Sequence, residues 1–81
     1  MIRREDFINI TDHLMKEPKL RTIKLKLTNN EIVLIYFAEA DKYKTVAHTY
    51  FLEVITKYGN YTSDVFIPYD NILSITGDID D

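Results

Sequence analysis

The sequence predicts a mostly β domain in which one N-terminal α-helix precedes five antiparallel strands that curve into a strongly bent, open barrel. Three observations support this fold class. Apolar residues recur first at helical spacing and then at a period of two, which is typical of half-buried strands. The pair Gly59-Asn60 predicts a tight hairpin. Residues 68–71, Pro-Tyr-Asp-Asn, join two short apolar runs and leave no room for a crossover helix, so the last strand departs in a new direction.

The first element is an amphipathic helix over about residues 4–16. Phe7, Ile10 and Leu14 follow the i, i+3, i+7 spacing of one helical face, and Met15 widens that face. Pro18 ends the helix, because a proline cannot continue the helical hydrogen bonds.

The strands are predicted at about 20–28, 31–40, 45–57, 61–67 and 71–76, and an acidic tail follows over 77–81. In the first strand, Ile23 and Leu25 alternate with Lys24 and Lys26, as in a strand with one buried face. The second and third strands are apolar on both faces. A small barrel buries only one face of each strand, so the helix or another chain must cover the other.

The length of 81 residues predicts a single domain, 1–81. One core of this size seldom supplies more than about 3–5 kcal/mol, and small domains add disulfides, a metal or a partner subunit. The chain has no cysteine, which excludes a disulfide or a thiolate zinc site, and we expect no metal and no cofactor. Self-association is therefore our first functional inference. The lack of cysteines, of a signal peptide and of a long apolar run predicts a cytoplasmic protein without a membrane partner.

The polar residues form no catalytic constellation, so we expect no enzyme and no catalytic residue. His13 and His48 have no second metal ligand at suitable spacing, and two glycines exclude a glycine-rich phosphate loop. The formal net charge is −3, but basic residues crowd the helix end and the first strand. They are Lys16, Lys19, Arg21, Lys24 and Lys26. Such a run is more often a solvated face than a phosphate-contacting patch.

Two segments carry a resemblance to a known family. The run LTNNEIVLIYFAEAD supplies Leu27, Asn29 and Asp41, and the run FIPYDNILSI supplies Ile67, Ile72 and Ile75. With the order of helix and strands, these positions resemble the Sm-like (LSm) family over almost the whole chain, as a divergent bacterial- or phage-type member. The chain departs from the family pattern at Asn30, where the turn glycine is expected, and at Pro68-Tyr69, where members carry a cation.

The resemblance implies the Sm-like fold, a five-stranded SH3-like barrel, and a function. Members of the family form rings that hold single-stranded RNA near a central pore. Carried onto this chain, the RNA-binding positions lie in the loop after the second strand and in the last turn. They are Asp41, Lys42, Tyr43, Lys44, Tyr69 and Asn71.

The resemblance also implies how subunits join, because the fourth strand of one subunit pairs with the fifth strand of its neighbour. The apolar residues on these strands form the expected subunit interface: Val65, Phe66, Ile67, Leu73 and Ile75. The expected partner is the chain itself, in a cyclic homo-oligomer of about five to seven subunits. Two alternatives stay open: the same ring acting as a protein-interaction or structural module without RNA, and a monomeric SH3-like adaptor.

Overall fold

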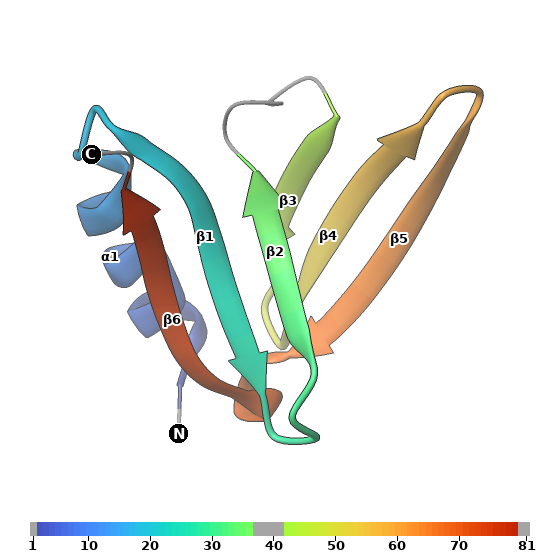
Figure 1. The fold of residues 1–81 in the computed structure, drawn as a ribbon. Helices are drawn as coiled ribbons and strands as arrows, with labels where there is room; N and C mark the ends of the chain where they lie inside the picture. Colours follow the sequence, from blue (N-terminus) through green and yellow to red (C-terminus); the bar gives the residue numbers. More distant parts are fainter. Residues whose placement is uncertain (1, 37–41, 80–81) are drawn as a thin grey trace.

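The computed structural model describes residues 2–36 and 42–79. Helix α1 (Arg4–Met15) precedes six strands, and a short 3₁₀ helix, η2 (Tyr69–Asn71), joins the last two. The strands are β1 (Leu20–Leu27), β2 (Ile32–Tyr36), β3 (Tyr43–Ala47), β4 (Phe51–Tyr58), β5 (Tyr61–Pro68) and β6 (Ile72–Ile79). They form two three-stranded antiparallel sheets, ordered β2-β1-β6 and β3-β4-β5 (Figure 1). The prediction of a mostly β fold with one N-terminal helix is confirmed, and the prediction of one five-stranded barrel is wrong.

Helix α1 begins where the Asp6 carboxylate accepts a hydrogen bond of 2.9 Å from the Arg3 backbone N–H. Glu5 and Asp6 lie in its first turn, where acidic side chains suit the helix dipole. Phe7 is buried and Leu14 packs against the core, as the sequence predicts. Ile10 and Met15 are 37% and 56% exposed, so the predicted apolar face is wrong at these two positions.

The first sheet has β1 at its centre, with β2 on one side and β6 on the other. The predicted end of the last strand at 76 is wrong, because β6 continues through Gly77 to Ile79. Gly77 pairs with Ile23 of β1, and a Cβ at Gly77 would lie 2.9 Å from Leu20 Cδ1 and 3.0 Å from Leu14 Cδ2. This glycine therefore lets α1 pack closely on the sheet, and the acidic tail begins after it.

In the second sheet, the single strand predicted over 45–57 is wrong, because a turn at His48 divides it into β3 and β4. The His48 N–H donates a 3.0 Å hydrogen bond to the Phe51 carbonyl, which closes this turn. The predicted strand 31–40 is described only in part, as β2 (Ile32–Tyr36), and the rest of it falls mostly outside the described residues. The predicted hairpin at Gly59 is confirmed, with Gly59 in the left-handed conformation at φ 58°.

The core lies between the two sheets and under α1, and β1 contributes more buried side chains than any other strand. The buried apolar residues of the core are Phe7, Ile23, Leu25, Leu27, Ile35, Leu52, Val54, Ile67, Tyr69 and Ile72. The β4–β5 hairpin extends away from this core, so its far end lies apart from the first sheet (Figure 1). Helix α1 is too short and too polar to cross a membrane, and it is the one α-helix among the described residues.

Candidate interaction surfaces

Strand β5 presents an open edge with exposed apolar side chains. It pairs with β4 alone, and seven of its eight residues are exposed. Tyr61 is 68% exposed and Phe66 is 56% exposed, and Val65 is also on the surface. Ile67, expected at the subunit interface, is instead a core residue. An unpaired strand edge of this kind is a ready template for another chain.

Strand β6 is also an open edge, because it pairs with β1 alone. Leu73, expected at the subunit interface, is exposed and lies at a register shift between Lys26 and Leu27 of β1. Ile79 is also exposed, whereas Ile75 is half-buried against the core. The five expected interface residues therefore divide into three surface residues and two that support the fold.

The residues expected to bind RNA do not form one site. Lys42 and Lys44 are exposed, and Tyr43 is half-buried with its ring 5.5 Å from that of Tyr36. Asn71 is exposed in η2. Asp41 lies outside the described residues.

Tyr69 is buried, so the prediction that it stacks on a base is wrong. Its hydroxyl donates a 2.7 Å hydrogen bond to the His48 carbonyl, and its ring lies 6.1 Å from that of Phe7. Burial raises the pKa of the Tyr69 hydroxyl, and the charge of Arg4 partly opposes that shift. Tyr69 thus ties the β3–β4 turn to the core. This turn contains no glycine, proline or asparagine, so no residue type in it indicates a turn.

Tyrosines and lysines gather where four strands end on one side of the molecule, a region we call the tyrosine–lysine rim. Figure 1 shows the end of β2, the start of β3 and the β4–β5 turn on this side. Tyr58 and Tyr61 pair across the hairpin with ring centroids 5.6 Å apart. The Lys57 N–H donates to the Lys42 carbonyl at 2.8 Å, which brings two lysines to the same end. The described members are Tyr36, Lys42, Tyr43, Lys44, Lys57, Tyr58 and Tyr61.

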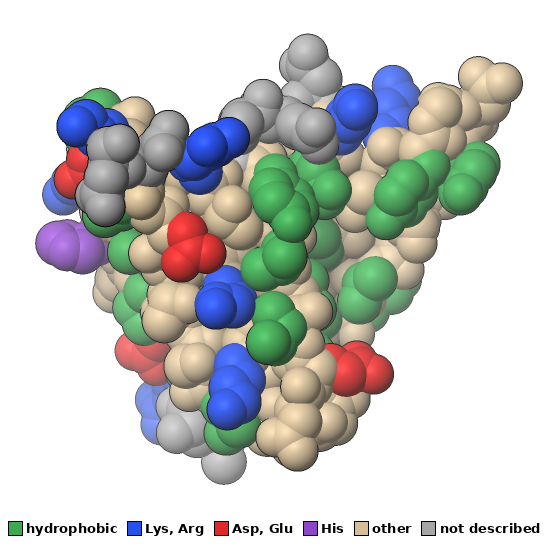
Figure 2. All heavy atoms as spheres, in the orientation of Figure 1, with side chains coloured by type: hydrophobic (Ala, Val, Ile, Leu, Met, Phe, Trp, Pro, Cys, Tyr) green, Lys and Arg blue, Asp and Glu red, His purple; other side chains and the backbone are tan. Residues whose placement is uncertain are grey.

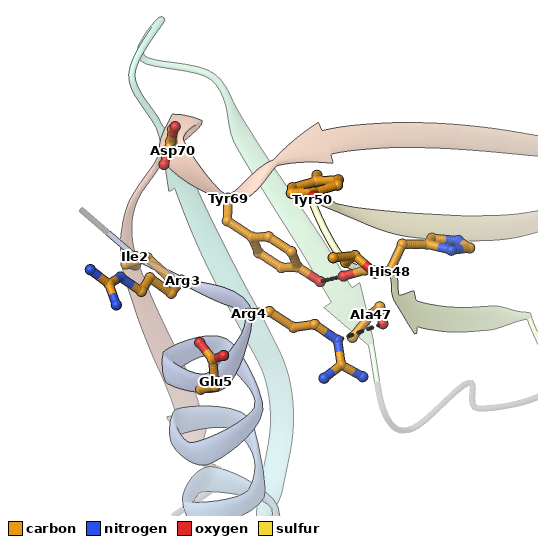
Figure 3. Close-up of a pocket in the computed structure, with 10 residues that line it drawn as sticks. Ile2, Arg3, Arg4, Glu5, Ala47, His48, Tyr50, Tyr69 and Asp70 are labelled. Atoms are coloured by element: carbon orange, nitrogen blue, oxygen red, sulfur yellow. Dashed lines mark hydrogen bonds between the residues drawn. The ribbon is translucent and has the colours of Figure 1, made fainter.

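A hollow of about 620 Å³ lies between the start of α1 and the β3–β4 turn. The Arg4 Nε donates a 3.0 Å hydrogen bond to the Ala47 carbonyl. Tyr69 and Tyr50 lie above the Arg4 side chain in Figure 3. Arg3 and Glu5 also line the hollow, as does Asp70. Side chains of both charge signs therefore line this hollow.

The outer faces of the two sheets differ in charge. On the first sheet, Lys24 and Lys26 of β1 lie opposite Leu34 and Ile32 of β2. Figure 2 shows this arrangement as basic side chains over β1 beside a column of hydrophobic side chains over β2.

On the second sheet, the outer face carries a pair of carboxylates, those of Glu53 and Asp64. Glu53 Oε1 lies 2.8 Å from His48 Nε2. Desolvation, a hydrogen bond with Glu53 and the charge of Glu53 raise the pKa of Asp64. The rings of Phe51 and Phe66 meet edge to face at 5.5 Å on the same side of the sheet. Among residues 2–36 and 42–79, no three acidic or histidine side chains cluster as a metal site.

Comparison of this chain with family models, with curated proteins and with solved structures finds no match. The Sm-like resemblance therefore stays a prediction that depends on the sequence motifs, and the functional argument depends on the surfaces described above.

Proposed function

We propose that this chain is a self-associating module, in which β5 of one copy pairs with β6 of the next to form a cyclic homo-oligomer. The observation that carries this proposal is that β5 and β6 are both open strand edges that bear exposed apolar side chains. An oligomer would also supply the burial that a core of this size lacks.

The open edge of β5 presents backbone amide groups to which another strand could hydrogen-bond. The Lys57 N–H points to β3, where it donates to Lys42. Since successive residues of a strand direct their amide groups to opposite sides, those of Thr56 and Tyr58 point to β5. They face Ser63 and Tyr61. The alternate residues of β5, namely Thr62, Asp64 and Phe66, therefore direct their N–H and C=O groups to the open edge.

The same reasoning applies to β6. The Leu27 N–H donates to the Glu31 carbonyl, on the β2 side of β1. The amide groups of Lys26 and Lys24 therefore point to β6, where their partners are Ser74 and Thr76. The alternate residues of β6, Ile75 and Gly77 among them, direct their backbone groups to the open edge.

The directions of the two strands allow a closed ring. Within one copy, β5 and β6 run in opposite directions (Figure 1). A rotation about an axis roughly along the strands keeps these directions, so β5 meets the β6 of a second copy in antiparallel orientation. The two contacting surfaces differ, and such head-to-tail contacts form rings when the rotation closes. We expect about five to seven subunits, as the family resemblance implies.

The test replaces, by proline, a residue whose backbone N–H points away from the rest of the sheet. Thr62→Pro removes an N–H from the free edge of β5 and leaves the β4–β5 hydrogen bonds intact. Thr45→Pro is the matched control, because Thr45 is also exposed and its amide group points away from β4. Light scattering and native mass spectrometry should give a multiple of 9.6 kDa for the unmodified chain and the control. Thr62→Pro should weaken association at least tenfold.

A single-chain mass at every concentration of the unmodified chain would overturn the proposal. Loss of association in Thr45→Pro but not in Thr62→Pro would overturn it as well, because the pairing edge would then be that of β3.

A second candidate function is binding of single-stranded RNA, which the tyrosine–lysine rim favours. Exposed aromatic rings stack on bases for about 1–3 kcal/mol each, and lysines contact phosphates. Short A-rich and U-rich oligonucleotides should bind, and binding should weaken with salt. Tyr61→Ala and Lys44→Ala should each reduce the affinity, whereas Lys19→Ala, in the turn between α1 and β1 and outside the rim, should not. No binding of either oligonucleotide at low salt would leave the ring as a protein-interaction module.

A further inference from the structure

The two open edges expose backbone groups of residues whose side chains lie on different faces. On β5, Val65 and Ile67 lie opposite the buried Val54 and Leu52, so their side chains are on the inner face of the sheet, although only Ile67 is buried there. The edge residues Asp64 and Phe66 therefore lie on the outer face.

On β6 the faces are reversed. Ile75 and Gly77 lie opposite the buried Leu25 and Ile23, so they are on the inner face, which α1 covers. Residues directly opposite each other in an antiparallel pair point to the same face. Pairing of the two edges therefore brings Asp64 and Phe66 of one copy against α1 of the next.

A groove exists where these side chains would lie. A hollow of about 280 Å³ separates the end of α1 from the end of β6, and His13, Glu17 and Ile79 are among its lining residues. Ile10 stands one helical turn before His13 on the same side of α1, and its side chain is 37% exposed. We call this surface, formed by Ile10, His13, Glu17 and Ile79, the α1–β6 groove.

We propose that the α1–β6 groove binds β5 of a second copy, with Phe66 of that copy against Ile10 and its Asp64 beside His13. This inference depends on the edge pairing proposed above and deepens it, because it specifies the face and the register of the contact.

Chemical complementarity selects the register. When Phe66 lies opposite Ile75 of the second copy, Asp64 lies opposite Gly77, where no side chain competes for space. A shift of two residues would place the Asp64 carboxylate opposite Ile75 and Phe66 opposite Leu73, at the irregular part of β6. The first register joins apolar to apolar groups and leaves the carboxylate near His13.

The charges agree with this register. Within its own copy, the Asp64 carboxylate lies beside that of Glu53, and the His48 ring contacts Glu53 but not Asp64. A cationic neighbour would therefore relieve the repulsion between the two carboxylates. The groove supplies His13 and Lys16, and its own carboxylate, Glu17, accepts a 3.3 Å hydrogen bond from the Lys19 N–H.

Engineered cysteines test the register directly, because the chain has no cysteine of its own. In the proposed register, Ser63 lies opposite Asp78 of the second copy in a pair without mutual hydrogen bonds, with Cα atoms about 4.5 Å apart. Ser63→Cys with Asp78→Cys should therefore give disulfide-linked multimers under mild oxidation. Ser63→Cys with Thr76→Cys is the matched control for the register shifted by two residues, and it should remain mostly unlinked.

Within one copy, the start of β5 and the end of β6 lie on opposite sides of the molecule, so an internal disulfide does not compete (Figure 1). Preferential linkage of the control pair would overturn the register while leaving edge pairing intact. No linkage in either variant, together with a single-chain mass, would overturn both proposals.

A second measurement tests the groove itself. Ile10→Glu should weaken association at least tenfold, because it places a charge against Phe66 and near Asp64. Met15→Glu is the control, since Met15 is 56% exposed but lies on the other flank of α1. Circular dichroism melts should show that both variants fold. Equal association constants for the two folded variants would overturn the groove contact, even if Thr62→Pro still abolishes assembly.

Discussion

Strands β1 and β5 both contain eight residues, but the protein uses them in opposite ways. β1 lies between two partners, and four of its residues are buried. β5 has one partner, and only one of its residues is buried. The difference does not follow from hydrophobicity alone, since Val65 and Phe66 are as apolar as the buried residues of β1. It follows from position, because α1 and the second sheet cover β1, whereas the single copy covers β5 only at Ile67.

This comparison separates residues that hold the fold from residues that are available for association. Removal of a side chain from β1 should lower the free energy of unfolding of every copy. Removal of a side chain from the exposed part of β5 should instead change the concentration dependence of assembly.

Leu25→Ala should produce the largest loss of stability. Leu25 is among the most fully buried side chains, and its truncation leaves a cavity that costs about 2–5 kcal/mol. Val65→Ala on β5 should cost less than about 1 kcal/mol in the single copy. Urea unfolding at low protein concentration measures both. Equal costs would show that the Val65 side chain already contributes to the core of the single copy.

Gly77→Val should cost about 1–3 kcal/mol, because the new side chain meets Leu14 and Leu20. Leu14→Ala makes room, so the double variant should lose less stability than the sum of the two single variants.

At Gly59, no atom lies within 4 Å of an added Cβ, and Gly59→Ala should cost about 1–2 kcal/mol through its φ of +58° alone. Its cost should therefore be additive with Leu14→Ala in thermal unfolding.

Much of the fold is predictable from local patterns. The helix, β1 and the hairpin at Gly59 follow from helical spacing, alternation and a turn pair. The turn at His48 was not predictable, because it contains no glycine, proline or asparagine and its stability depends on the distant Tyr69 hydroxyl. The continuation of β6 through Gly77 was also missed, since a glycine usually ends a strand unless a close neighbour requires it.

The candidate surfaces were only partly predictable. The sequence identifies β5 and the final strand as apolar, but alternation cannot show that Val65 lacks cover while Ile67 is buried. The exposure of Ile10 likewise depends on how α1 rotates on the sheet. A tyrosine in an exposed turn and a tyrosine that anchors a core look alike in sequence, which explains the error at Tyr69.

Tyr69→Phe should cost about 1 kcal/mol, because it removes the donor to the His48 carbonyl. The effect should be local, so amide exchange at His48, whose N–H closes the β3–β4 turn, should accelerate more than exchange in β1. Tyr50→Phe is the control, since Tyr50 is 82% exposed and should change neither quantity. Unchanged exchange at His48 in Tyr69→Phe would show that the turn is stable without this hydrogen bond.

The smallest effect concerns pH and the carboxylate pair on the outer face of the second sheet. The pKa of Asp64 is raised above its usual 3.8 by desolvation and by Glu53, so the folded state favours the protonated form. This contribution to stability is present below pH 3.8 and is lost as the pH rises through the raised pKa. Asp64→Asn should therefore match the parent at low pH and exceed it at neutral pH. Measurement in the Thr62→Pro background separates this fold effect from assembly. A variant that is less stable at neutral pH would show that the Asp64 charge stabilises β5 rather than straining it.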